Sequence, residues 1–350
     1  MSEREGKGER DGDRLPLPLL IGDIGGTHAR FAAVADDGTS ERLADQDTAD
    51  HATIEDAIAA ALGGHRLRPR AALLALAAPI AGDTVPLTNC DWVVAPRRLM
   101  ARFGLSDVAL VNDFEAQALS LPGLGPGDID PIGGGAIAPE GARVVVGPGT
   151  GLGAGALIRA AGAAGAGGGL WVPVPGEGGH VDLGPQSDRD FAIWPHIARP
   201  VGRVEAETVI SGDGIVRLYR AIAAADRRDV RHETPEAVTG AALAGSDPAA
   251  VEALGLFATY LGRLAGDLAL IFMATGGVYL AGGIAGKIAP MLKSGAFRAA
   301  FVTKPPHDRL LAGIATAIVV KEDAALAGLA ALVREPGAFA VDLSGRRWRG

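Results

Sequence analysis

Cysteine is almost missing from this sequence, in which Cys90 is the sole thiol among 350 residues. One thiol can form neither an internal disulfide nor the thiolate cluster of a structural zinc site, so we exclude both. The scarcity of cysteine also suits a protein of a reducing compartment.

Basic residues are fewer than acidic ones, with 33 Lys and Arg against 41 Asp and Glu and a formal net charge of −8. This balance argues against non-specific binding to nucleic acid or to anionic membranes. No uninterrupted apolar run is long enough to span a bilayer, because the long stretch at 261–273 contains Arg263 and Asp267. We therefore expect a cytoplasmic protein that binds neither nucleic acid nor a membrane.

Apolar residues are plentiful, and 48% hydrophobic with 21% charged residues is the composition of a globular protein. The length is enough for two domains. Residues 1–15 are set apart, because 1–14 mix acids and bases without an apolar core and predict a disordered tail rather than a signal peptide. The Gly- and Pro-rich segment 122–139 is predicted to be a linker.

Short apolar runs and helical patterns alternate in the first third of the chain. The sequence predicts strands at 19–22, 31–35, 41–44, 71–78 and 108–111, and helices at 53–62 and 96–103. Hairpin-linked strands followed by crossover units indicate a mixed sheet with helices on its faces. The pattern of strand, glycine turn and strand returns at 142–158, so we expect an internally duplicated α/β architecture with a cleft between two domains.

Helices dominate the remainder of the predicted pattern. They are expected at 189–197, 214–225, 248–274, 284–292 and 322–333, with strands at 171–174, 278–281 and 314–320. The longest helix repeats apolar residues from Val251 to Ile271 at the spacing of a stripe that faces a core.

The stretch at 107–115 joins a buried strand to a helix through Asn112 and Asp113. A charge at the end of a buried strand is costly unless it is paired or used, and ligands of open α/β sheets bind at the carboxyl ends of strands. Asp113 is therefore a candidate general base, with Asn112 as donor and acceptor beside it. The alternative is that Asp113 only caps the helix that begins at Phe114.

Three glycine turns follow apolar strands, at 25–26, 149–153 and 282–283. Glycine lets backbone N–H groups approach an anion closely, although glycines also serve hairpins and helix ends. Together with Asp23, Thr27 and Thr150, the three turns point to a triphosphate and a metal ion. Neither the Walker pattern nor the dinucleotide fingerprint fits them.

Glu177 and His180 lie on a Gly- and Pro-rich loop rather than on a helix. A carboxylate and an imidazole on such a loop can bind a metal ion, clamp the hydroxyl groups of a ligand or belong to an ordinary surface loop. No second His or Cys cluster is near in sequence, which disfavours the metal.

At this point the chain resembles the bacterial glucokinases of the hexokinase and actin-like ATPase superfamily, over most of residues 19–335. Seven segments in the same order carry the resemblance: Asp23-x-Gly-Gly-Thr-x-Ala-Arg30, Leu87-Thr-Asn89, Asn112-Asp113-Phe114, Gly149-Thr-Gly-Leu-Gly153, Gly176-Glu-Gly-Gly-His-Val-Asp182, Glu207-x-Val-Ile-Ser-Gly212 and Ala281-Gly-Gly-Ile284. The resemblance implies two actin-like (ribonuclease H-like) α/β domains, one formed by residues 16–123 with 321–350 and the other by 124–320.

The resemblance also implies an activity, the ATP-dependent phosphorylation of glucose at its 6-hydroxyl with Asp113 as general base. The residues that it assigns to glucose are Asn112, Asp113, Glu177, His180 and Glu207. The residues that it assigns to the phosphates and Mg²⁺ are Asp23, Gly25, Gly26, Thr27, Gly149, Thr150, Gly151 and Gly153, with Asp23 reaching the metal through water. Gly282 and Gly283 would lie against the nucleoside. We also expect a homodimer.

The chain departs from the family pattern at His28, where asparagine is usual, and the tails at 1–14 and 335–350 lie outside the resemblance. A related family of sugar kinases and sugar-responsive repressors carries a Cys-rich zinc motif, which one cysteine cannot build. Three alternatives stay open: a kinase of the same superfamily for another hexose, a non-catalytic sugar sensor and a structural actin-like protein.

Overall fold

The structure is a computed structural model that describes residues 14–161 and 169–350. Most of the predicted tail and of the Ala- and Gly-rich run after Arg159 lies outside the described residues. Contacts between Cα atoms divide the chain into two compact units. Unit 1 consists of Met1–Gly123, Arg159–Pro173 and Glu322–Gly350, and unit 2 of Leu124–Ile158 and Val174–Lys321. The predicted domain boundaries, 16–123 with 321–350 and 124–320, differ from this division in the assignment of 159–173.

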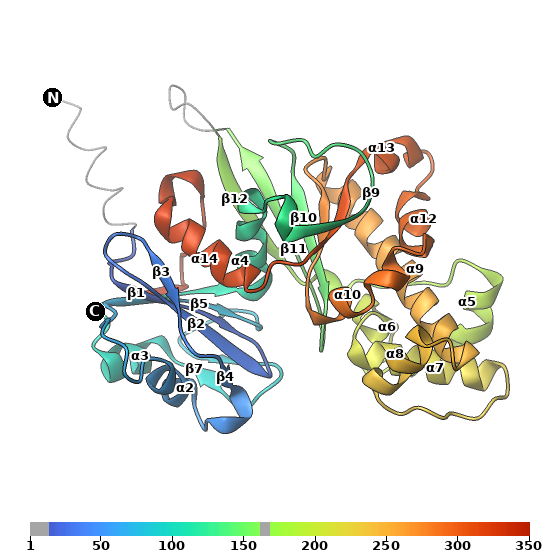
Figure 1. Cartoon of the computed structure of the whole chain (residues 1–350), viewed down its shortest axis with the longest axis horizontal. Helices are drawn as coiled ribbons and strands as arrows, with labels where there is room; N and C mark the ends of the chain where they lie inside the picture. Colours follow the sequence, from blue (N-terminus) through green and yellow to red (C-terminus); the bar gives the residue numbers. More distant parts are fainter. Residues whose placement is uncertain (1–13, 162–168) are drawn as a thin grey trace. The chain divides into compact units, whose positions relative to one another are not determined.

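Unit 1 is built on a seven-stranded sheet in the order β15-β8-β5-β1-β2-β3, in which β4 also pairs with β2 (Figure 1). The strands are β1 (Leu19–Ile24), β2 (His28–Val34), β3 (Ser40–Arg42), β4 (Gln46–Asp47), β5 (Ala71–Leu76), β8 (Asp107–Asn112) and β15 (Arg347–Arg349). β1, β5 and β8 are parallel, whereas β2 and β15 run antiparallel to their neighbours. The parallel strands are covered on both faces, which explains their nearly continuous apolar sequences.

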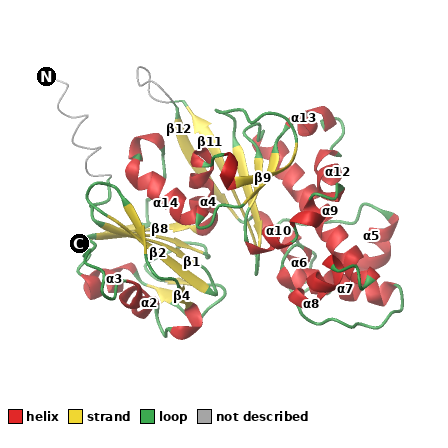
Figure 2. Ribbon diagram, in the orientation of Figure 1, coloured by secondary structure: helices red, strands yellow, loops and turns green. Residues whose placement is uncertain are grey.

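Alternate residues of these strands belong to two different cores. Leu20 and Leu74 pack with α2 and α3, whereas Ile21 and Leu73 pack with α4 and α14. The helices lie on opposite faces of the sheet (Figure 2), and their bounds are α2 (Ile54–Ala61), α3 (Pro96–Phe103), α4 (Asp113–Ser120) and α14 (Ala324–Arg334). The two-residue period of a strand thus divides the interior of unit 1 into two layers. A short hairpin of β6 (Val85–Pro86) and β7 (Val93–Val94) packs on the first of them.

The second sheet repeats this plan with six strands in the order β12-β11-β10-β13-β14-β9, and most of it lies in unit 2, although β12 begins in unit 1. Its strands are β9 (Ile129–Gly133), β10 (Arg143–Pro148), β11 (Leu152–Ala160), β12 (Leu170–Gly176), β13 (Val278–Leu280) and β14 (Thr316–Val319). β10, β13 and β14 are parallel, β11 forms a hairpin with β10, and β9 runs antiparallel to β14 at the edge.

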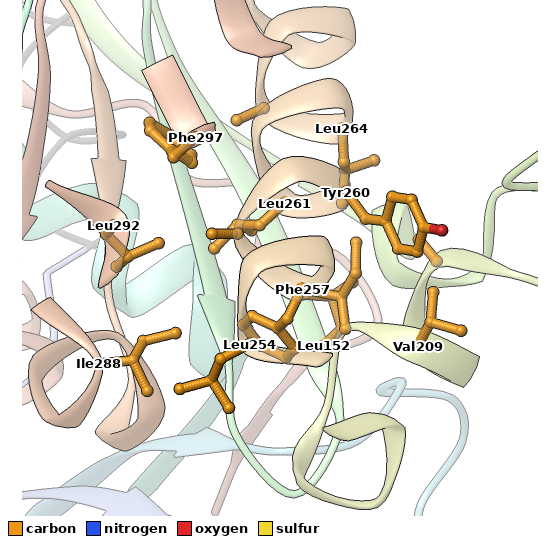
Figure 3. Packing of buried hydrophobic residues seen from close by; sticks show 14 of the residues in the cluster. Leu152, Val209, Leu254, Phe257, Tyr260, Leu261, Leu264, Ile288, Leu292 and Phe297 are labelled. Atoms are coloured by element: carbon orange, nitrogen blue, oxygen red, sulfur yellow. The ribbon is translucent and has the colours of Figure 1, made fainter. Parts of the chain in front are cut away.

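The helices of unit 2 gather around α9, the longest of them. Leu254, Phe257 and Leu261 of α9 are fully buried and meet side chains of the sheet and of neighbouring helices (Figure 3). Asp247 caps the helix by accepting from the N–H of Ala249 at 2.9 Å. The helices are α5 (Asp188–Ile193), α6 (Ala206–Val209), α7 (Gly212–Ala225), α8 (Pro235–Leu243), α9 (Pro248–Phe272), α10 (Gly283–Lys287), α11 (Ala289–Leu292), α12 (Ala296–Val302) and α13 (Asp308–Gly313).

By length and composition, α9 is the one helix in the described residues that is apolar enough to cross a membrane, and 67% of its most apolar window is buried in the protein. A buried core helix passes the same test, so α9 is weak support for a membrane span.

Three predicted elements differ from the structure. The predicted linker contains β9, whose Pro131 is tolerated because an edge strand leaves one row of backbone groups unpaired. The single helix predicted at 284–292 is two helices, since Pro290 has no N–H to continue the ladder. The helix predicted at 189–197 ends at Ile193 and continues as a 3₁₀ turn that contains Pro195.

Candidate active site

Asn112 and Asp113 join β8 to α4 in unit 1. The Oδ1 atom of Asn112 accepts from the N–H groups of Phe114 at 2.9 Å and Glu115 at 3.3 Å. Glu115 accepts in return from the N–H of Asn112 at 3.3 Å, which completes a capping box. The alternative that Asp113 caps the helix is therefore wrong, because Asn112 fills that position. Asp113 is the first helical residue, where the helix dipole favours a negative charge.

Asp23 lies near the carboxyl end of β1, on the same side of the sheet as the carboxyl end of β8. The strand register aligns Ile24 with Leu76 and Leu76 with Asn112, so the carboxyl ends of β1 and β8 are level. Two strand spacings separate β1 from β8, or about 10 Å. Burial raises the pKa of Asp23, against the lowering effect of Arg30 and Arg42. The Asp23 carboxylate lies 3.7 Å from the guanidinium of Arg30, so a partly buried anion stands at the first glycine turn.

The first glycine turn closes the hairpin of β1 and β2. The N–H of Gly25 donates to the carbonyl of His28 at 3.0 Å, and the hydroxyl of Thr48 donates to the carbonyl of Gly26 at 2.7 Å. Thr27 and His28 are exposed. The imidazole of His28, which replaces the usual asparagine, lies 2.6 Å from the carboxylate of Asp47. Hydrogen bonds at Gly25 and Gly26 thus fix the backbone of the turn, while Thr27 and His28 at its tip face solvent.

The second and third glycine turns lie side by side in unit 2. Gly149 donates its N–H to the carbonyl of Gly151 at 2.8 Å in the turn between β10 and β11. Gly282, which follows β13, has a φ of +84°, and a Cβ atom there would lie 2.8 Å from the carbonyl oxygen of Pro148. Only glycine adopts this backbone conformation at such a close approach without strain. Gly153 lies in β11 opposite Gly147, and Thr150 is exposed at the tip of the turn.

Glu177, His180 and Glu207 meet in unit 2. Glu177 and His180 flank a 3₁₀ turn (Gly178–His180), and their carboxylate Oε2 and imidazole Nε2 are 4.0 Å apart. Glu207 lies in α6 and accepts from the N–H of Leu152 at 2.8 Å, which ties it to the second glycine turn. A Cβ atom at Gly151 would lie 2.6 Å from the same carboxylate, so the glycine there makes room for Glu207.

Glu205 is a residue of this cluster that the sequence did not reveal. Its Oε1 lies 3.1 Å from Nδ1 of His180, and this hydrogen bond is the main reason why the pKa of His180 is raised. Because Nδ1 faces a carboxylate, the neutral ring keeps its proton there and presents Nε2 as an acceptor. The position of Glu205, two residues before Glu207, was the one signal in the sequence, but spacing alone does not show that the side chain turns back to His180.

The ligand atoms of His180, Glu205 and Glu207 lie within 4.8 Å of one another and have the types that bind metal ions. Arg203, however, lies 2.8 Å from Glu205 and also donates to the carbonyl of His180 at 2.7 Å. A guanidinium at this position offsets the charge of Glu205 and repels a cation. The group therefore suits neutral, hydroxyl-bearing ligands better than a metal.

The structure thus brings the predicted residues together in two groups. Unit 1 holds Asp23 and its glycine turn at one sheet edge with Asn112 and Asp113. Unit 2 holds the other two glycine turns, with the polar cluster of Glu177, His180 and Glu207 beside the turn at Gly151.

Known proteins share this sequence and fold. The family model described as Glucokinase matches residues 20–336. The glucokinase of Chelativorans sp. (strain BNC1) is 52% identical over 337 residues, which are 96% of either chain. A glucokinase structure from an Antarctic psychrotroph superposes with a TM-score of 0.76 and 29% identity over 91% of this chain and 98% of that one. A ROK family glucokinase from Streptomyces griseus, solved with glucose and AMPPNP, gives 0.60 and 24% over 91% and 99%.

The fold is the two-domain actin-like ATPase fold of sugar kinases. The family model covers far more than half of the chain, and the identity to a full-length relative exceeds half. The chain belongs to the glucokinase family.

Proposed function

We propose that Asp113 is the general base of an ATP-dependent phosphorylation of glucose, the reaction of the family to which the chain belongs. The carboxylate takes the proton of the 6-hydroxyl while that oxygen forms its bond to the γ-phosphorus of ATP, and the bond to the β–γ bridging oxygen breaks. The products are glucose 6-phosphate and ADP. The position of Asp113 at the amino end of α4, with capping assigned to Asn112, is the observation that carries this role.

The sugar is held by Asn112 with Asp113 and by Glu177, His180 and Glu207. The Oδ1 atom of Asn112 is engaged in the cap, so its Nδ2 amide is the group that donates to a sugar hydroxyl. Nε2 of His180 accepts from a hydroxyl, because Glu205 keeps the ring proton on Nδ1. The glucose complex of the S. griseus relative supports glucose as a ligand of this fold.

The phosphates are bound by backbone N–H groups of the turns at Gly25–Thr27 and Gly149–Gly153, with Thr27 and Thr150 adding hydroxyls, and Gly282 and Gly283 lie against the nucleoside. Asp23 suits Mg²⁺ through water, since it offers a hard carboxylate oxygen beside the first glycine turn. Bound Mg²⁺ neutralises charge on the transferred phosphoryl group, and phosphoryl transfer depends mainly on such neutralisation and on positioning. AMPPNP in the S. griseus structure, an analogue of ATP, supports the nucleotide site.

We further propose a cytoplasmic homodimer. A single cysteine suits a reducing compartment. Sedimentation of the purified chain at several concentrations tests the dimer.

A coupled assay that follows ADP release tests the proposed reaction. We expect turnover with ATP and glucose that requires Mg²⁺, with mannose and N-acetylated hexoses as weaker acceptors. If turnover were higher with another hexose, that hexose and not glucose would be the preferred substrate. Glucose binding by calorimetry without turnover would leave the chain a sugar sensor.

A further inference from the structure

The last residues of the chain form the edge of the sheet that carries Asp113. The family model ends at residue 336, and the segment beyond it includes β15, which pairs antiparallel with β8. Trp348 is buried, and its Nε1 donates to Asp83 at 2.7 Å. The N–H of Leu110 donates to the carbonyl of Arg346 at 2.9 Å. Without this segment β8 would be the edge strand of the described sheet, so the C-terminus completes the strand that leads to the catalytic base.

Arg346 reaches from this segment to the helix that follows β8. Its Nη1 and Nη2 donate to the two carboxylate oxygens of Glu115 at 2.6 Å and 3.3 Å, and the Glu115 side chain is 1% exposed. The same Glu115 accepts from the N–H of Asn112 in the capping box. The forked geometry of guanidinium and carboxylate fixes both position and orientation. A chain of direct contacts therefore runs from Arg346 through Glu115 to Asn112, the neighbour of Asp113.

We propose that Arg346 is a positioning residue of the kinase, which acts through Glu115 to fix Asn112 and the first turn of α4, where Asp113 lies. This inference rests on the role of Asp113 proposed above. A buried carboxylate that loses its cation is strongly disfavoured. Without Arg346, the Glu115 side chain turns away or takes up a proton, and the capping box that orients Asn112 loses one of its two hydrogen bonds.

Arg347, which directly follows Arg346 and begins β15, offers a matched control. It binds Asp107 through Nη2 at 2.7 Å, and this pair is also buried. Asp107, however, is the first residue of β8, at the opposite end from Asn112 and Asp113. Loss of either arginine therefore removes a buried ion pair that anchors the C-terminus, but only Arg346 contacts the capping box.

The test compares Arg346→Gln with Arg347→Gln in the full-length chain. Both variants are expected to have a lower Tm. We expect kcat to fall about tenfold in Arg346→Gln, because a displacement of ~1 Å at a catalytic group costs up to ~10²-fold. The KM for ATP should change little, and Arg347→Gln should keep kcat near that of the unaltered chain. In Arg346→Gln, the amide protons of Phe114 and Glu115 should exchange faster, while those of β1 should not.

A lysine pair keeps the test decisive if a glutamine variant does not fold. Arg346→Lys retains a cation beside Glu115 without the fork, so it should recover part of kcat, and Arg347→Lys is its control. Equal kcat in the two variants of a pair, or a lower kcat with unchanged exchange at Phe114 and Glu115, would overturn the proposal. If Asp113→Asn were fully active, the proposed base would be wrong, whereas the exchange rates would still report whether Arg346 holds the cap.

Discussion

The two units share one arrangement of strands but differ in the residues that come after the third parallel strand. β3-β2-β1-β5-β8 corresponds to β12-β11-β10-β13-β14, and each series ends in an antiparallel edge strand, β15 or β9. Each hairpin closes through a glycine turn. In unit 1, β8 leads to Asn112 and Asp113, whereas in unit 2, β14 leads to Val320 and Lys321, and Lys321 pairs with Asp128 at 3.0 Å. The duplicated frame thus supplies a glycine turn twice, whereas the candidate base follows the third parallel strand of unit 1 only.

The largest effect on kcat should come from removing the carboxylate of Asp113, which follows β8. Asp113→Asn is expected to lower kcat by ~10²–10⁴, the usual contribution of a general base, with glucose affinity by calorimetry nearly unchanged. Lys321→Gln alters the segment after β14 in unit 2 and breaks a half-exposed ion pair of about 0–1 kcal/mol, so its turnover should be normal. Normal turnover in Asp113→Asn would mean that the residues after β8 matter no more for catalysis than those after β14. Asp113 would then have only an electrostatic role at the start of α4.

A smaller effect is expected in the polar cluster of unit 2. His180→Ala should raise the KM for glucose about tenfold to a hundredfold, because a sugar hydroxyl and the buried carboxylate of Glu205 both lose their partner, and an unpaired buried polar group costs ~1–3 kcal/mol. The KM for ATP should stay nearly constant. His196→Ala replaces an exposed histidine of the same unit and serves as the control. A lower Tm with an unchanged KM for glucose would show that the loop of His180 is structural.

A glycine of each turn closely approaches a neighbouring residue, which is the carboxylate of Glu207 for Gly151 in the second turn and Asn89 for Gly26 in the first. Gly151→Ala places a methyl group against the Glu207 carboxylate, so Glu207 and the turn at Gly151 must move apart. Overpacking costs ~1–3 kcal/mol, and the end of a glutamate side chain yields easily, so we expect both KM values to rise about fivefold. Gly184→Ala, where nothing lies within 4 Å of the new atom, is the control. Unchanged KM values would mean that the turn and Glu207 move independently.

The smallest effect is a pH dependence that should be confined to unit 2. The hydrogen bond to Glu205, and then the charges of Glu207, Glu205 and Glu177, raise the pKa of His180 against the effect of burial. A group with a raised pKa in the folded state stabilises the protein fully below its unfolded pKa, about 6.5 for histidine, and this contribution is lost as pH rises through the folded value. Glu205→Gln should therefore flatten the decrease in the free energy of unfolding above about pH 6.5, measured by urea titration. An equally steep decrease in the variant would assign it to other groups.

Much of the fold could be predicted because its strands and helices carry local signals. β1, β5 and β8 are buried on both faces, and such strands appear as continuous apolar runs. The helix predicted at 96–103 matches α3, since Pro96 starts it and Gly104, with a φ of +68°, ends it. β15 was missed, because the three residues Arg347-Trp-Arg349 are too few to show an apolar run or a sustained alternation. That strand exists only because β8 offers an unpaired edge.

The site was predictable in its residue types and less so in their roles. Asn112 and Asp113 were found, but which of them caps α4 depends on a rotamer that the sequence does not display. Glu205 and Arg203 were missed, since acidic and basic residues near a loop are common and only their contacts distinguish them. The capping role of Asn112 and the contacts of Glu205 and Arg203 all depend on where a side chain points, which the sequence does not show.

By itself, the sequence determined the duplicated frame, the glycine turns and the segments shared with glucokinases, because each of these depends on neighbouring residues and on backbone conformation. The tertiary structure alone decided which charges meet. Glu115 and Arg346 are 231 residues apart, and their pairing follows from the strand β15 reaching the edge of the sheet beside β8. Such contacts depend on the path of the whole chain, which local periodicity does not record. The support of the candidate base is therefore visible only in the folded protein.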